Sequence, residues 1–322
     1  MDEKNLFIHH PVLLEQSVKG LAIKPTGIYV DGTLGGGGHA AAIVENLGPD
    51  GLLVGIDRDK DAIAASTERL KNFDVPFIPV WDNHDNIQQI LQDLSIKMVD
   101  GFLLDLGVSS FQLDTPSRGF SYRYDSPLDM RMDHRDKLSA YDVVNKFPEK
   151  KLAQIIKDYG EERYAKGISK ALCRHRINAP IESTLELAQI ITDATPKRPP
   201  SHGHPAARTF QAIRIVVNSE LIKLSETIEA MAKLLAPKGR ICIITFHSLE
   251  DRIVKQAFKY WSDPCLCPRD IPYCVCKKEP LLSIITRKPI KPNQEEITQN
   301  PRSHSAKLRI CTATLDAKEG RE

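Results

Sequence analysis

The chain has 322 residues, 41% hydrophobic and 27% charged, which is typical of a folded globular protein and excludes wholesale disorder. The formal net charge is only +2, so any basic surface that binds nucleic acid must be local. We see no secretory signal, and the longest apolar run, 241–246, is too short to span a bilayer, so we expect a cytoplasmic protein with reduced cysteines and no membrane partner.

The first third of the chain alternates short apolar runs with helical patterns. This pattern predicts strands at 28–31, 52–57, 75–80 and 101–105, and helices at 39–46, 60–71 and 86–94. Such alternation is typical of a parallel sheet with right-handed crossovers. The fold class that we predict is therefore α/β.

A glycine-rich turn, Asp31-Gly-Thr-Leu-Gly-Gly-Gly-Gly-His39, follows the first strand and precedes a helix. Glycines let a backbone approach a ligand closely, and this arrangement binds nucleotide-type cofactors. Asp57 ends the second strand, where a carboxylate can accept hydrogen bonds from ribose hydroxyls. No Lys-Ser/Thr pair follows the glycines, which excludes a P-loop but leaves dinucleotides and S-adenosylmethionine open. Asp31 and Asp105, both at strand ends, favour the cationic S-adenosylmethionine.

After the fourth strand the alternation stops. The charged, turn-rich composition of 112–136 predicts a long loop. The apolar spacing after it predicts three amphipathic helices. Gly160 is expected to cap the C-terminus of the first, and Ser183 the N-terminus of the third. Residues 210–235 are helical, as two helices if Asn218 and Ser219 cap the second. Strands are expected again at 240–246, 282–286 and 307–314, with a helix at 251–261. We interpret 113–207 as a helical insertion into one α/β domain made of 1–112 and 208–322.

Several longer motifs resemble those of the small-subunit ribosomal RNA (cytosine-N4)-methyltransferases, known as the MraW family. The resemblance runs from His10-Pro-Val-Leu-Leu-Glu15 to Asn300-Pro-Arg-Ser-His-Ser-Ala-Lys-Leu-Arg309, and its specific parts include Leu103-Leu-Asp-Leu-Gly-Val-Ser-Ser110 and Phe246-His-Ser-Leu-Glu-Asp-Arg252. It implies a class I methyltransferase (Rossmann-like) sheet with an inserted helical subdomain. It also implies S-adenosylmethionine as methyl donor. The acceptor would be the N4 amine of a cytidine in the decoding region of small-subunit (16S) ribosomal RNA, within the 30S particle.

The resemblance also implies which residues bind the cofactor. The family's positions fall on Gly37, Gly38, His39, Asp57, Asp105 and Gln112. A further position, usually Phe, holds His84 in this chain. Either the imidazole stacks on adenine in its place, or neighbouring Trp81 covers the ring.

The catalytic residues that we predict are Asp105, His247 and Ser248. The cytosine amine is a poor nucleophile, so a catalyst must hold its N–H groups in acceptors and orient the nitrogen toward the methyl group. Asp105 is the best-positioned acceptor, unless it binds only the cofactor. His247 would take the released proton, unless it is a structural turn residue.

RNA contact is predicted in three stretches, of which the third contains Arg287, Lys288 and Lys291. Arginines and aromatics alternate in the loop after Asp105, and a basic stretch without carboxylates runs from Pro196 to Arg214. The residues that we predict to contact RNA are Arg118, Phe120, Tyr122, Arg131, Arg208 and Arg214. The alternatives are an aromatic core under the loop and a linker with solvated charges.

Four of the seven cysteines cluster as Cys265-Leu-Cys267 and Cys274-Val-Cys276. This spacing predicts a structural Zn²⁺ in preference to disulfides. The other functional hypotheses are a non-catalytic RNA-binding assembly factor and a nicotinamide-dependent oxidoreductase. The retained carboxylates argue against the first, and the missing third glycine argues against the second.

Overall fold

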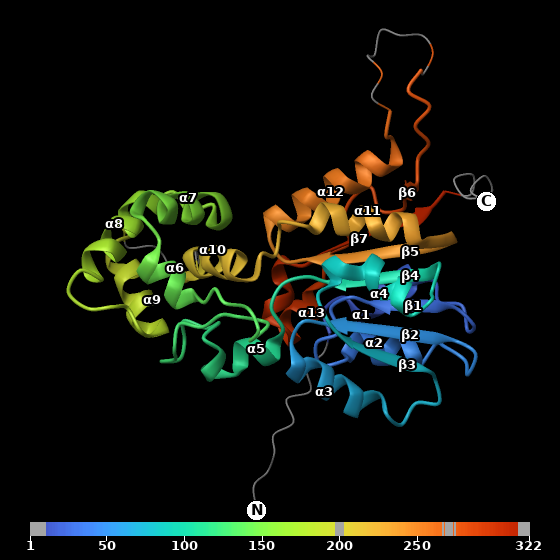
Figure 1. The fold of residues 1–322 in the computed structure, drawn as a ribbon, viewed down its shortest axis with the longest axis horizontal. Coiled ribbons are helices and arrows are strands. Elements are labelled where there is room, and N and C mark those ends of the chain that lie inside the picture. Colours follow the sequence, from blue (N-terminus) through green and yellow to red (C-terminus); the bar gives the residue numbers. More distant parts are fainter. Residues whose placement is uncertain (1–10, 197–202, 266, 268–272, 274, 315–322) are drawn as a thin grey trace, which may run out of the picture. The chain divides into compact units, whose positions relative to one another are not determined.

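The structure is a computed structural model that describes residues 11–196, 203–265, 267, 273 and 275–314 (Figure 1). The chain divides into two compact units. Unit 1 comprises Met1–Gly107 and Lys223–Glu322, and unit 2 is Val108–Ile222. The insertion is therefore wider than the 113–207 predicted, because α5 (Ser110–Asp114) and α10 (Ala207–Asn218) belong to unit 2.

Unit 1 is built on a seven-stranded sheet of order β3-β2-β1-β4-β5-β7-β6. Strands β1 to β5 are parallel to one another, whereas β7 runs antiparallel to both β5 and β6. The strand bounds are β1 Ile28–Asp31, β2 Leu52–Asp57, β3 Phe77–Trp81, β4 Val99–Asp105, β5 Leu235–Thr245, β6 Leu282–Ile284 and β7 Lys307–Ala313. The strand order reverses between β1 and β4, and in open α/β sheets ligands bind at the carboxyl ends of strands at such a point. The predicted Rossmann-like α/β fold is confirmed.

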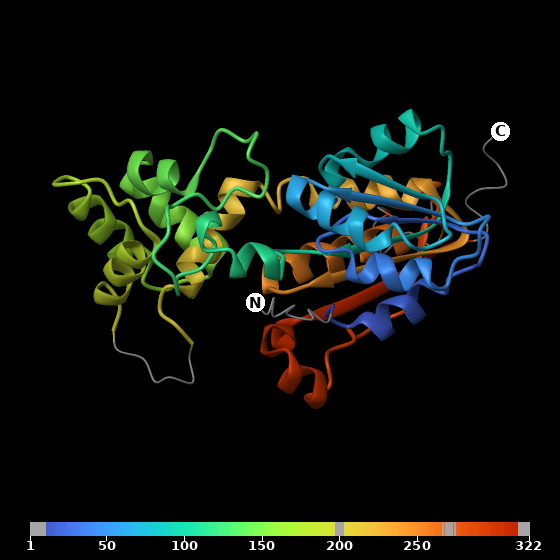
Figure 2. The same cartoon turned by 90° about the horizontal axis from the view of Figure 1, so that it is seen from below.

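Helices cover both faces of this sheet (Figures 1 and 2). One group consists of α1 (Leu14–Leu21), α2 (Gly38–Val44) and α3 (Lys60–Leu70), and the other of α4 (Ile87–Asp93), α11 (Leu224–Leu234) and α12 (Ser248–Ser262). The central strand β4 is covered on both faces, so Phe102, Leu103 and Leu104 are all buried. The short helix α13 (Gln294–Gln299) precedes β7.

Several bounds in unit 1 differ from the sequence-based expectation, most of all the start of β5, and one helix was missed. Strand β5 begins at Leu235 rather than Arg240, because Leu235 pairs with Val99 before a register shift. Helix α1 was not predicted, although Leu21 lies in the core that it forms with the sheet. Within the described ranges, no helix is both long and apolar enough to cross a bilayer.

Unit 2 is helical, as predicted. Its helices α6 (Ala140–Lys146), α7 (Glu149–Gly160), α8 (Ala165–His175), α9 (Thr184–Asp193) and α10 surround one apolar core. Gly160 is not the cap that the sequence suggested, since it lies inside α7 and Glu161 takes the left-handed conformation, at φ 47°. A Cβ at Gly160 would lie 2.6 Å from the Arg208 carbonyl oxygen, so glycine allows α7 to pack closely on α10.

Candidate functional site

The glycine turn joins β1 to α2 at the carboxyl edge of the sheet. Gly35 and Gly37 have φ values of 50° and 72°, which glycine adopts without strain. A Cβ on Gly38 would collide with the Pro11 ring, so this side of the turn is packed. At Gly36, by contrast, no described atom lies within 4 Å of the Cβ position. The turn therefore has one packed side and one side open to a ligand.

Asp57, at the end of β2, anchors this turn. Its Oδ2 accepts a hydrogen bond of 2.7 Å from the Gly35 N–H, and its Oδ1 accepts one of 2.8 Å from the Asp59 N–H. Burial raises the pKa of Asp57, against the effect of these two donors. Each carboxylate oxygen has a further lone pair, so the residue can still accept from ribose hydroxyls. Its role in holding the turn was not foreseen from the sequence.

Asp31 and Asp105 end the neighbouring strands β1 and β4, and both carboxyl groups are crowded by negative charge. Burial, together with the charge of Asp57, raises the pKa of Asp31 to about 7. Burial also raises the pKa of Asp105 well above its ordinary value, and the charges of Asp31 and Glu250 add to this. Such a site favours a bound cation, which would let the carboxyl groups ionise.

One oxygen of each carboxyl group is left for a ligand. Asp31 Oδ1 accepts from the Thr33 N–H at 3.1 Å, and Thr33 Oγ1 accepts from the Asp105 N–H at 2.6 Å. Asp31 Oδ2 and Asp105 Oδ1 are buried and accept no hydrogen bond from the residues that the structure describes. Because buried polar atoms normally have partners, these two oxygens are expected to meet polar or charged groups of a ligand.

His39 lies on α2 beside this pair. Its Nε2 donates to the Val12 carbonyl oxygen at 3.1 Å, and its Nδ1 lies 3.7 Å from Asp105 Oδ2. A carbonyl oxygen can only accept, so Nε2 carries a proton in this arrangement. The predicted residues Asp105 and His39 are therefore close together at the carboxyl edge.

Trp81 ends β3 at the same edge of the sheet, and His84 follows three residues later. His84 lies in a 3-10 turn with its Nδ1 3.3 Å from Asp85 Oδ1, and its Cβ is 3.3 Å from where a Cβ of Gly32 would be. Trp81 is paired in register with Asp57, its indole N–H donates to the Arg58 carbonyl, and 39% of it is exposed. Trp81 is thus placed beside Asp57 and His84 beside Gly32, and which ring covers adenine stays a prediction.

His247 forms the N-cap of α12, after β5. Its Nδ1 accepts from the Glu250 N–H at 3.4 Å, and its Nε2 lies 3.0 Å from Glu250 Oε1. Glu250 Oε2 in turn accepts from the Phe246 and His247 N–H groups. These reciprocal contacts form a capping box, with histidine in place of the usual Ser or Thr. The contacts favour the structural alternative for His247, and proton transfer by His247 or Ser248 stays a prediction.

Several known proteins are similar in sequence to this chain. The model of the MraW methylase family matches residues 6–314. The chain belongs to the MraW methylase family. Its relatives named ribosomal RNA small subunit methyltransferase H include that of Lachnospira eligens, 53% identical over 305 residues, or 94% of this chain and 97% of the relative. The relative from Clostridioides difficile is 52% identical over 306 residues, or 95% and 98%. The protein is therefore a methyltransferase, with a class I domain as expected.

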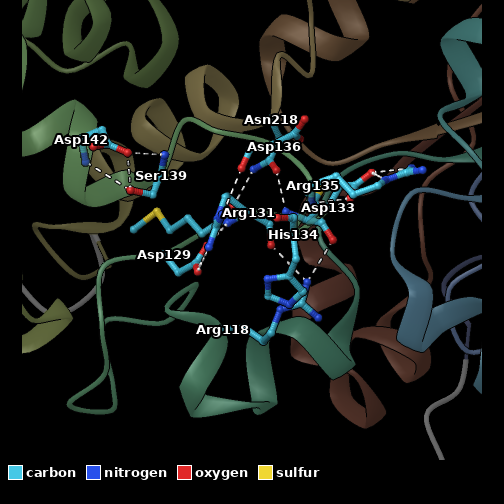
Figure 3. A network of polar contacts seen from close by, with 12 residues as sticks. Arg118, Asp129, Arg131, Asp133, His134, Arg135, Asp136, Ser139, Asp142 and Asn218 are labelled. Atoms are coloured by element: carbon cyan, nitrogen blue, oxygen red, sulfur yellow. Dashed lines mark hydrogen bonds and ion pairs between the residues drawn. The ribbon is translucent and has the colours of Figure 1, made fainter.

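Two residues that we predicted to bind RNA are buried in unit 2 of this MraW-family protein. Arg118 is 4% exposed, and its Nη2 donates to the carbonyl oxygens of Arg131 and Met132 at 3.1 and 3.0 Å (Figure 3). Phe120 is 6% exposed and belongs to the apolar core. The alternative of a core under the loop fits these two side chains, and RNA contact by either has no support here, because neither presents a surface.

The other predicted RNA contacts are more accessible, although each has partners within unit 2. Arg131 forms a double hydrogen bond to Asp129, with both distances 2.8 Å, and Arg214 pairs with Glu220 at 2.9 Å (Figure 3 shows the first). Tyr122 stacks on His204 with ring centroids 4.4 Å apart. Arg208 is exposed and donates to the Glu161 carbonyl. Their roles toward RNA stay predictions.

Gln112, predicted to bind the cofactor, lies in unit 2. It completes a capping box on α5, where its Oε1 accepts from the Ser109 N–H at 3.1 Å and its own N–H donates to Ser109 Oγ at 3.2 Å. Of the predicted zinc ligands, Cys265, Cys267 and Cys276 are described, whereas Cys274 lies outside the described residues.

Asn218, which was expected to cap a second helix, instead ties α10 to the loop before α6. Its Oδ1 accepts from the Met132 N–H at 2.7 Å, and its Nδ2 donates to the Met130 and Arg214 carbonyls at 2.8 and 3.0 Å. Figure 3 shows Asn218 beside the loop that carries Arg131. Replacing Asn218 with Ala would leave buried groups without partners, so we expect Asn218→Ala to lower the unfolding free energy by about 2–3 kcal/mol. Urea denaturation measures this. The control is Gln189→Ala, which removes an exposed bond to Asp193, and an equal loss in both variants would contradict the prediction.

Proposed function

We propose that the protein methylates the exocyclic N4 amine of a cytidine in the decoding region of small-subunit ribosomal RNA, with S-adenosylmethionine as donor and the 30S particle as substrate. The observation that carries this proposal is the pair of crowded carboxyl groups at the reversal point of the sheet, the buried Asp31 and the partly exposed Asp105. The names of the relatives, at 52–53% identity, support the ribosomal substrate. Such a substrate would place the protein in the cytoplasm.

The residues of unit 1 fit S-adenosylmethionine in charge and shape. The open glycine turn suits the close approach of an amino acid and a nucleoside that carry no phosphate. Asp31 Oδ2 and Asp105 Oδ1, which have no hydrogen-bond partner among the described residues, suit a cation. When bound, S-adenosylmethionine supplies an electrophilic methyl group on a sulfonium. The residues that we propose to hold it are Gly37, Gly38, His39, Asp57, His84, Asp105 and Gln112.

The protein must compensate for a weak nucleophile. The N4 lone pair is delocalised into the cytosine ring, and a carboxylate that accepts an N4–H hydrogen bond localises it on nitrogen. Asp105 Oδ1 has no partner among the described residues and lies at the carboxyl end of a central strand, so we assign this role to Asp105. The N4 nitrogen gains the methyl group and loses one proton. Asp105 or His247 is the proposed acceptor of that proton.

For the RNA itself, we propose unit 2 as the recognition subdomain. Tyr122 and Arg208 are the contacts that we favour, since a half-exposed stacked ring and an exposed guanidinium suit base stacking and phosphate contact. Arg131 and Arg214 could contribute charge while they keep their carboxylate partners.

The test uses purified protein, labelled S-adenosylmethionine and 30S subunits from cells that lack this gene. We expect label in small-subunit RNA and, after digestion, N4-methylated cytidine by mass spectrometry. Protein-free 16S RNA, run in parallel, tests whether the assembled particle is needed. Binding of S-adenosylmethionine without any methylated cytidine would contradict the proposal and favour a non-catalytic assembly factor.

A further inference from the structure

Residues 263–281 join α12 to β6, and the described parts at the two ends of this excursion, 263–265 and 275–281, run away from the sheet (Figure 1). Its base is closed by a hydrogen bond of 2.9 Å from the Leu281 N–H to the Trp261 carbonyl. Beyond this base Pro264 is buried, but Tyr273 and Val275 are 80% and 68% exposed. A segment that buries so little apolar surface is not held in one conformation by hydrophobic packing. It needs a cross-link, such as a disulfide or a metal ion.

Three cysteines meet in this excursion. The sulfur atoms of Cys265, Cys267 and Cys276 all lie within 4.8 Å of one another, and Cys265 Sγ is 3.8 Å from Cys276 Sγ. Zinc binds thiolates tetrahedrally with Zn–S of about 2.3 Å, which separates two sulfur ligands by about 3.8 Å. A disulfide would need about 2.05 Å. The observed spacing therefore suits sulfurs that share one metal ion.

A backbone donor and positively charged residues accompany these sulfurs. The Val275 N–H points to Cys267 Sγ at 3.3 Å, and a backbone donor of this kind stabilises negative charge on a metal-bound sulfur. Lys277 and Lys278 follow Cys276 directly in the chain. Their positive charge would offset the net negative charge of zinc bound by several thiolates.

We propose that Cys265, Cys267 and Cys276 hold a structural Zn²⁺. The ion would hold together the two ends of an excursion that hydrophobic packing does not fix. Because zinc would bind the folded state alone, it would stabilise that state. It would take no part in methyl transfer. Helix α12, which has 15 residues and is about 22 Å long, separates His247 at its N-cap from the excursion after its end.

The first test is the metal content of the full-length protein, purified under reducing conditions without a chelator and measured by mass spectrometry. We expect about one zinc per chain, and about a tenfold lower content in Cys276→Ser. The matched control is Cys173→Ser, which replaces a partly buried thiol of α8 in unit 2 and should keep its zinc. Zinc-free wild type, iron in place of zinc, or equal zinc in both variants would overturn the proposal.

A second measurement guards against a variant that simply misfolds. Zinc is removed from the wild-type protein with a chelator, and limited proteolysis is followed within residues 263–281. We expect faster cleavage there, reversed by added Zn²⁺, with S-adenosylmethionine affinity unchanged. Unchanged cleavage after zinc loss would contradict the structural role. Because metal content and cofactor affinity are measured separately, this outcome is distinct from a failure of the proposed methyl transfer.

Discussion

Asp105→Asn is expected to lower the rate of methyl transfer by about a hundredfold to ten-thousandfold with the fold intact. The amide has nearly the same shape, and the Asp105 N–H can keep its bond to Thr33 Oγ1. It carries no charge, however, and its nitrogen cannot accept an N4–H hydrogen bond. The loss should therefore persist at saturating S-adenosylmethionine. Single-turnover methylation of 30S subunits, with cofactor affinity measured by calorimetry, provides the readout.

The control for this variant is Asp100→Asn, at the other end of β4. Asp100 accepts hydrogen bonds from Lys24 Nζ at 2.6 Å and from the Ile28 N–H at 3.0 Å, far along the strand from the carboxyl edge. We expect this variant to lose some stability but to keep its rate. If Asp105→Asn weakened cofactor binding yet reached the wild-type rate at saturation, Asp105 would be a cofactor ligand only.

Asp31→Asn is expected to stabilise the cofactor-free protein above pH 7 while weakening cofactor binding at least tenfold. The folded-state pKa of Asp31 is about 7, raised above its ordinary value by burial and the charge of Asp57. Between about pH 4 and pH 7 the folded state therefore holds a proton that the unfolded state has released, so stability falls as pH rises. The full cost, reached above pH 7, is about 4 kcal/mol. The neutral amide removes this cost but also removes a charge that attracts the cation.

Urea unfolding at intervals from pH 5 to pH 8 measures this effect, with and without S-adenosylmethionine. The wild type should lose stability with rising pH in the absence of cofactor, and less steeply in its presence, because a bound cation lowers the pKa of Asp31. The exposed Asp74 provides the control variant, Asp74→Asn, whose profile should follow the wild type. A parallel slope in Asp31→Asn would show that Asp31 is not the group responsible.

The sequence was sufficient for the elements that its local patterns specify. Short local patterns predicted all seven strands, and Asp31, Asp57 and Asp105 were recognised because each ends a mainly apolar strand. The start of β5 was not recognised, because it depends on pairing with β4 rather than on residues near Leu235. Similarly, α10 was assigned to the wrong side of the boundary, since its place in unit 2 comes from packing on α7.

Side-chain roles that depend on distant partners were the hardest to infer. An arginine in a loop with aromatic residues is typical of a nucleic-acid contact. The Arg118 side chain is buried instead, and it donates to carbonyl oxygens that lie 13 and 14 residues further along the chain. Asn218 reads as a cap, yet its main partners are 86 and 88 residues away. His247 lacks the Ser or Thr signature of a capping box, although Glu250 supplies the other half.

The insertion of unit 2 between β4 and α11 has a consequence for how the protein forms. Strands β4 and β5 are neighbours in the sheet, but the whole of unit 2 is synthesised between them. If unit 2 were a long flexible loop, the entropy lost on closing it would slow the pairing of β4 with β5. An insert that has already folded around its own helices brings the two strands closer together and makes their pairing faster. The rate at which unit 2 folds would then limit the rate at which the sheet of unit 1 forms.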